Sequence, residues 1–166
     1  MALRGVAAEL PEGVEELCLV RFGLIARGFS ARRYARGVER AISAAATRAI
    51  ADGAGLLRDE PIVLGRGHRG RLQYWSSFAA MDAWSHREPH AAWWRGAVDR
   101  MRSRGDLGVY HEAYLVPRAS VESIYLDCDS PVGLSAFSVT RPADGPRSTA
   151  RDRLGRRGTD PPGLRT

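Results

Sequence analysis

The segment from Leu17 to Leu24, with the sequence LCLVRFGL, is apolar almost throughout and is interrupted by Arg21. A short run of this kind is typical of a strand that is covered on both faces of its sheet. The chain has 166 residues, of which 44% are hydrophobic, which suits one domain with a real core. The run therefore predicts a domain built around a sheet, and the rest of the chain must supply its cover.

The hydrophobic period then changes several times along the chain. Apolar residues recur at helical spacing between arginines after Ser30, and Asp52-Gly53 ends that pattern. Ser77 is a candidate helix cap, and Pro89 suits the first turn of another helix. The predicted elements are a helix over 31–51, a hairpin of strands 55–65 and 71–76, helices from Ser77 and from Pro89 to Gly105, and strands over 106–116 and 121–126.

This order predicts an α+β fold of the ferredoxin-like type, a split βαβ arrangement with an antiparallel sheet. Its helices cover one face of the sheet, so the other face needs a cover of its own. The simplest cover is a second copy packed face to face, which makes a homodimer of the dimeric α/β barrel type. The alternative is a monomer in which the last strand and the loops cover that face.

The charge is unevenly distributed between a nearly neutral body and a basic C-terminal end. The formal net charge is +6, and residues 141–166 contain seven Arg and three Asp. We therefore expect an N-terminal extension over 1–15, the ferredoxin-like domain over 16–140 and a disordered Arg-rich tail over 141–166. A basic tail can bind the phosphates of nucleic acid. A solvated extension explains the same charge more simply, so we do not expect nucleic acid as a partner.

Nothing in the sequence predicts a membrane protein or a metal site built from cysteines. No apolar run is long enough to span a bilayer, and the N-terminal residues lack the basic-then-apolar order of a secretory signal. Cys18 and Cys128 have no partner at metal-ligand spacing. We therefore expect a cytoplasmic location.

Two histidines are the strongest candidates for chemistry. His90 lies on the apolar face of its predicted helix with Trp94, and His111 lies among apolar residues on one face of the strand 106–116. Facing a common cavity, the two imidazoles would suit haem iron ligation and proton transfer near neutral pH. The alternative is that each is an ordinary core histidine with a hydrogen-bond partner.

Aromatic residues are numerous near these positions and are candidates for the walls of a substrate site. We expect Tyr74, Trp75 and Tyr114 to contact a small-molecule substrate. Ordinary core packing is the alternative explanation for such aromatics.

Four segments together resemble a known family of small proteins. They are QYWSSF at 73–78, HAAW at 90–93, GVYHEAY at 108–114 and ESIY at 122–125. The sequence resembles the monooxygenase-like family named after a member in fumagillin biosynthesis, over roughly residues 17–137. The resemblance implies a small enzyme that acts on a small organic molecule in secondary metabolism.

The C-terminal half also resembles the haem-dependent aldoxime dehydratases, which have two tandem ferredoxin-like halves. The matching segments are SHREPH at 85–90, YHE at 110–112, IY at 124–125 and GL at 133–134. This resemblance implies haem b as cofactor, with His90 as the iron ligand beside Trp94 and His86 held as an alternative ligand. It also implies that His111 is the distal acid/base, and we place Glu112 with it in the catalytic group.

Three functions remain open from the sequence. The first is a haem enzyme that inserts oxygen or dehydrates an N–OH group. The second is a cofactor-independent monooxygenase in which His111 deprotonates the substrate, whose carbanion reacts with O₂. The third is a non-catalytic binding protein that uses the Arg-rich tail.

Overall fold

Residues 17–115 form the split βαβ arrangement that the sequence predicts. The computed structural model describes residues 3–155 of the chain, and these fall into two compact units, residues 17–115 and residues 3–16 together with 116–155. The first unit contains a four-stranded sheet in the order β3-β4-β2-β5. Its elements are β2 (Glu16–Ala26), α1 (Gly28–Ala51), β3 (Leu56–Gly65), β4 (His68–Trp75), α2 (Phe78–Ser85), α3 (His90–Arg104) and β5 (Leu107–Pro117).

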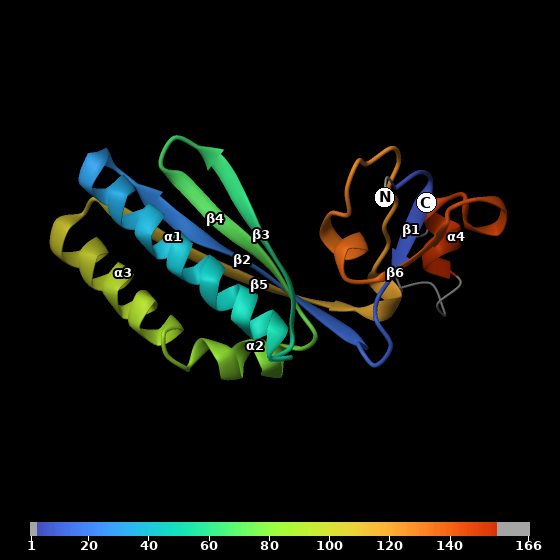
Figure 1. Cartoon of the computed structure of the whole chain (residues 1–166), viewed down its shortest axis with the longest axis horizontal. Helices are drawn as coiled ribbons and strands as arrows, with labels where there is room; N and C mark the ends of the chain where they lie inside the picture. The colour runs from blue at the N-terminus through green and yellow to red at the C-terminus, as the bar shows by residue number, and fades with distance from the viewer. Residues whose placement is uncertain (1–2, 156–166) are drawn as a thin grey trace, which may run out of the picture. The chain divides into compact units, whose positions relative to one another are not determined.

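The helices of this unit end and begin where the sequence signals predict. Ser77 caps α2 by accepting a hydrogen bond from the backbone N–H of Ala80. Gly105 ends α3 in the left-handed conformation, with φ of 62°. In Figure 1 α1 and α3 lie on the same face of the sheet.

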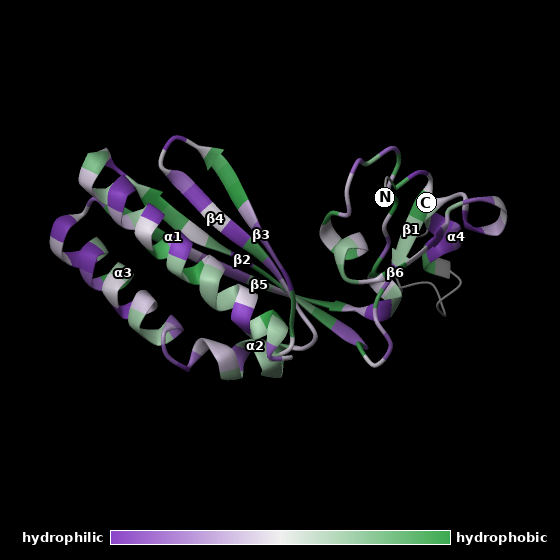
Figure 2. Ribbon diagram, viewed as in Figure 1, coloured by the Kyte–Doolittle hydropathy of each residue, from purple (hydrophilic) through white to green (hydrophobic). Residues whose placement is uncertain are grey.

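The core lies between the sheet and its helices. Small residues of α1, among them Ala46 and Ala49, pack on Cys18, Val20 and Trp75. Towards the start of α1, Ala31 and Ala35 pack with Ala97 of α3 and Leu107 of β5. Figure 2 shows the matching pattern along α1, where hydrophobic and hydrophilic bands alternate.

A buried polar network lies on the same side of the sheet. Asp59 and Arg71 form an ion pair with side chains only 5% and 7% exposed, and Arg71 Nε lies 2.7 Å from Asp59 Oδ1. Gln73 donates to Asp59, and Trp75 Nε1 donates to the Gln73 side chain at 3.1 Å. The network therefore links β3 and β4 beneath α1.

The other face of the sheet carries charged and polar side chains among its apolar ones, although the apolar run at 17–24 predicts a strand covered on both faces. Arg21 and Glu112 form an ion pair there at 3.1 Å. The ring of Tyr110 crosses two strands over Gly23 and Gly70, where an added Cβ would lie 2.6 and 2.5 Å from its hydroxyl oxygen. The glycines thus make room for Tyr110, and none of the three helices of this unit lies on this face in Figure 1.

The second unit brings the two ends of the described chain together. Strand β1 (Val6–Glu9) pairs antiparallel with β6 (Val139–Pro142). Two turns of 3-10 helix (Arg118–Ser120 and Gly133–Ala136) precede β6, and a third (Gly145–Arg147) and α4 (Ala150–Gly155) follow it. Arg147 lies 2.8 Å from the Glu9 carboxylate, and Arg153 lies 2.5 Å from that of Glu122.

The structure corrects two predictions here. The predicted disordered tail contains part of β6 and all of α4 within residues 141–155, because their arginines find acidic partners; residues 156–166 lie outside the described residues. The strand predicted over 121–126 makes only an isolated bridge, between Val6 and Tyr125. The two compact units are divided at 16/17 and 115/116 in the sequence. Within residues 3–155, no helix has both the length and the apolar content needed to cross a membrane.

Candidate functional site

His90 and His111 line one surface pocket of the first unit. His90 is the first residue of α3, and His111 lies in the middle of β5. The pocket is lined by residues of α2, α3 and β5, with the corner between the two helices: Phe78, Met81, Asp82, Ser85, His86, His90, Ala91, Trp94, Arg95, His111 and Ala113. The structure thus brings the two histidines to one cavity.

His90 is held in one tautomer by the preceding helix. Its Nδ1 lies 2.8 Å from the carbonyl oxygen of Ser85, which can only accept, so Nδ1 carries the proton. In the neutral ring Nε2 then keeps its lone pair. The Trp84 ring packs 5.0 Å from the imidazole, and burial lowers the pKa of His90, so the neutral form is favoured.

His111 has a different environment. Its ring stacks on Phe22 at 6.4 Å and meets the edge of Trp94 at 6.5 Å between centroids. Burial lowers the pKa of His111, and the neighbouring His90 lowers it further. Among residues 3–155 no hydrogen bond fixes its ring, and the lowered pKa favours the neutral imidazole, which can exchange a proton with a bound molecule.

An apolar cavity lies beside this pocket, between α1 and α3 over the sheet. Its cavity volume is about 60 Å³, it is partly open to solvent, and it shares His90 and Trp94 with the histidine pocket. Its walls include Phe22, Leu24, Val38, Ile42, Trp93, Ala97 and Val109. This apolar lining is typical of sites for small organic molecules.

The donor set fits haem better than a free metal ion. Within the described residues no three His, Cys, Asp or Glu side chains cluster to hold a metal. A haem iron needs only one protein ligand, and the fixed tautomer of His90 offers that ligand beside apolar walls.

Two other predicted site residues, His86 and Glu112, have different surroundings. His86 lines the same pocket, but its side chain is 75% exposed beside Asp82. Glu112 points to the opposite face of the sheet, where it accepts from Arg21 and Tyr114. Because strand side chains alternate, Glu112 cannot share the pocket of His111.

The three predicted substrate contacts are also separated from the histidine pocket. Trp75 is fully buried in the core and packs on Trp84 at 5.4 Å. Tyr74 and Tyr114 lie on the opposite face, and Tyr114 is 53% exposed. Phe22, the ring neighbour of His111, was not predicted as a site residue, although alternation from Val20 places it on the core side.

Comparisons with known proteins agree with this architecture. A crystal structure of aldoxime dehydratase superposes with a TM-score of 0.66 at 20% identity, covering 92% of this chain and 45% of that one. Aldoxime dehydratase OxdRE in complex with butyraldoxime gives 0.64 at 18% identity, covering 90% and 42%. These likenesses show the fold, and the chain spans less than half the length of either protein.

The sequence comparisons identify one protein family. No curated protein sequence matches the chain. A family model described as monooxygenase af470-like matches residues 26–134, which include both histidines.

Proposed function

Because this chain belongs to the monooxygenase af470-like family and is an enzyme of that fold, we propose that it converts a small organic molecule at the histidine pocket. In this proposal His90 is the protein ligand of haem b and His111 is the acid/base that serves the substrate. His86 is then a second-choice ligand, and Trp94 contacts whatever fills the cavity.

The observation that carries the proposal is the hydrogen bond from His90 Nδ1 to the Ser85 carbonyl. A bond of this type orients the ring and raises the basicity of the opposite nitrogen, as in many metal-ligating histidines. Bound haem would supply redox-active iron, and the apolar walls between α1 and α3 would exclude water from it.

The second half of the proposal concerns proton transfer. His111 is neutral, has no fixed hydrogen-bond partner among residues 3–155, and lines the pocket that also contains His90. A ring nitrogen of His111 can therefore take a proton from the substrate or return one. Phe22 and Trp94 hold the imidazole ring in place from two sides.

The environment of His111 also favours a second candidate, a cofactor-independent monooxygenase. Here neutral His111 removes a proton from an electron-rich substrate, and the resulting carbanion reacts directly with O₂. The apolar cavity would then hold the substrate alone. Oxygen consumption by a colourless preparation distinguishes this candidate from the haem enzyme.

The setting of the enzyme follows from the same proposal. We propose a cytoplasmic homodimer, joined through the sheet face without helices, that acts in secondary metabolism. Its partner molecules are a small organic substrate and a second copy of the chain.

A haem titration followed by Soret absorbance tests the roles of the histidines. Wild type should bind haem stoichiometrically, and His90→Ala should lose binding or shift the band. His111→Ala should retain the band and lose turnover by roughly two to four orders of magnitude. His86→Ala, from the same pocket, is the matched control and should behave as wild type.

Three outcomes would contradict the assignment. Loss of the band in His111→Ala alone would reverse the two roles, and loss in His86→Ala alone would move the ligand by one turn. A wild type that takes up no haem, but consumes O₂ with a His111-dependent rate, would establish the second candidate.

A further inference from the structure

Arg69 lines the apolar cavity and also two surface grooves beside α1. Its side chain comes from β4, is 40% exposed, and lies 3.1 Å from the carboxylate of Glu39 on α1. Only one nitrogen of the guanidinium contacts Glu39, so further donors remain for another acceptor.

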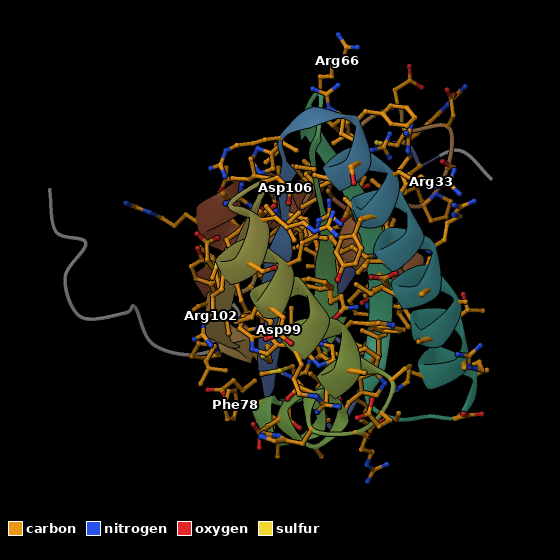
Figure 3. The ribbon with its side chains drawn as sticks, turned by 90° about the vertical axis from the view of Figure 1, so that its left-hand side faces the viewer. Arg33, Arg66, Phe78, Asp99, Arg102 and Asp106 are labelled. Atoms are coloured by element: carbon orange, nitrogen blue, oxygen red, sulfur yellow. The ribbon has the colours of Figure 1, made fainter. Side chains whose placement is uncertain are left out.

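The grooves next to Arg69 carry a local excess of positive charge. Within residues 3–155 their other arginines form no ion pair, except Arg71, which is bound by Asp59. These unpaired groove residues are Arg32, Arg33, Arg36, Arg40 and Arg66. Figure 3 shows Arg66 beyond the β3–β4 turn and Arg33 on the side of α1 away from α3.

Some arginines on other elements form ion pairs, whereas Arg87, Arg102 and Arg104 form none within residues 3–155. Arg58 pairs with Glu60, Arg100 with Asp106, and Arg21 with Glu112. The surface beside α1 differs in that its unpaired arginines line two neighbouring grooves whose acidic residues, Glu39 and Asp59, are already bound by Arg69 and Arg71.

Two observations indicate a ligand rather than a solvated helix face. Nε of Arg32 is buried without a hydrogen-bond partner in the described chain. Phe29 and Val63 line the same groove and are 76% and 61% exposed. A surface that combines unpaired cations with exposed apolar side chains suits a molecule that has both an anionic group and an apolar body.

We infer that the cavity binds an apolar molecule carrying an acidic group, a carboxylate first of all, and that Arg69 binds this group. Arg32 and Arg36 raise the positive potential around it, and Glu39 competes with it for Arg69. The inference rests on the proposed function in using the same cavity, and it adds the chemical class of the ligand.

Calorimetric titration of the metal-free protein with decanoate and with decan-1-ol tests the inference. The two probes share a chain and differ in the charge of the end group. Wild type should bind decanoate about tenfold more tightly than the alcohol, because a charge-assisted bond to Arg69 is available only to the acid. High salt should reduce this difference.

Variants at the ion pair give shifts of opposite sign. Arg69→Gln should weaken decanoate binding about tenfold and leave the alcohol unchanged. Glu39→Gln should strengthen decanoate binding several-fold, since it frees Arg69. Arg48→Gln is the matched control, because Arg48 is exposed on the same helix but lines neither groove.

Equal binding of the two probes by wild type would overturn the inference, and so would an Arg69→Gln variant that binds decanoate normally. Val38→Trp fills the cavity wall and should abolish binding of both probes. Decanoate binding that survives in a folded Val38→Trp protein would place the acid on the surface and also contradict the inference.

The carboxylate can belong to the substrate or to haem, whose porphyrin carries two. If it belongs to the substrate, the haem-loaded protein still binds decanoate. If it belongs to haem, loading removes decanoate binding, and Arg69→Gln weakens haem uptake but not uptake of the haem dimethyl ester.

These titrations need no turnover, so the two proposals fail separately. His111→Ala should keep the preference for decanoate. A protein with that preference but without activity would contradict the proposed function alone, and an active protein without the preference would contradict this inference alone.

Discussion

The carbonyl oxygen of Ser85, at the end of α2, accepts a hydrogen bond of 2.8 Å from Nδ1 of His90, the first residue of α3. The corner between the two helices thereby sets the tautomer of the candidate ligand. Since the acceptor belongs to the backbone, no side-chain substitution at Ser85 removes it. The orientation of His90 therefore depends on the packing of the corner, including the Trp84 ring at 5.0 Å.

Burial of His90 should make the stability of the protein depend on pH. The folded chain holds the pKa of His90 below its ordinary value of 6.5, so the unfolded chain binds a proton first as the pH falls. The free energy of unfolding should be highest above about pH 6.5 and should fall as the pH drops from there through the lowered pKa. Urea unfolding at pH 7 and pH 5 measures this loss.

Substitution separates His90 from the other groups that titrate in this range. His90→Gln should lose less stability between pH 7 and pH 5 than wild type. His86→Gln, at an exposed position, should keep the wild-type dependence. A His90→Gln protein as sensitive to pH as wild type would contradict the assignment of a buried neutral imidazole.

The buried pair of Asp59 and Arg71 should contribute strongly to stability. Arg71→Gln leaves a nearly buried carboxylate without its charged partner, which typically costs about 3–5 kcal/mol. Arg58→Gln on β3 removes the more exposed pair with Glu60 and should cost less than about 1 kcal/mol. Equal losses in urea unfolding would show that Asp59 finds another partner when Arg71 is absent.

Much of the first unit was predictable because its signals are local. The apolar run at 17–24 and the helical spacing after Ser30 define β2 and α1, and Gly105 marks the end of α3. The pairing of β1 with β6 joins Val6 to Pro142 and has no local signature. The arginines of β6 and α4 gave a composition typical of a disordered tail. Their acidic partners, Glu9 and Glu122, are distant in the sequence and could not be predicted.

The candidate site was predictable in the same measure. The apolar spacing predicted that His90 and His111 lie on the core sides of their helix and strand, and both line one pocket. The prediction placed adjacent strand residues in the same site: Tyr74 with Trp75, and His111 with Glu112. Because strand side chains alternate, the two members of each pair lie on opposite faces of the sheet. The contact between Arg69 and Glu39 depends on how α1 crosses β4, which no short pattern contains.

Arg153 should stabilise the second unit, although it lies in the tail that the sequence predicts to be disordered. Its side chain is only 9% exposed, lies 2.5 Å from Glu122 and also donates to the carbonyl oxygens of Arg147 and Ser148. Arg153→Gln should therefore cost roughly 1–3 kcal/mol. Arg151→Gln, at an exposed position of α4, should change stability by less than about 0.5 kcal/mol. Equal thermal shifts for the two variants would refute a structural role for Arg153.

The sheet face opposite the helices should join two copies of the chain. Leu72 lies there between strands, paired with Arg21 of β2 and Glu60 of β3, and no helix of its unit covers it. A stable interface of standard size would bury roughly 800 Å² on each partner. Sedimentation velocity should therefore show a dimer at micromolar concentration, and Leu72→Arg should convert it to a monomer by placing an unpaired charge in the interface.

Val63→Arg is the matched control, since Val63 is 61% exposed on the helix side of β3, and this variant should leave the dimer intact. A monomeric wild type, or dissociation by Val63→Arg instead of Leu72→Arg, would place the contact elsewhere or remove it.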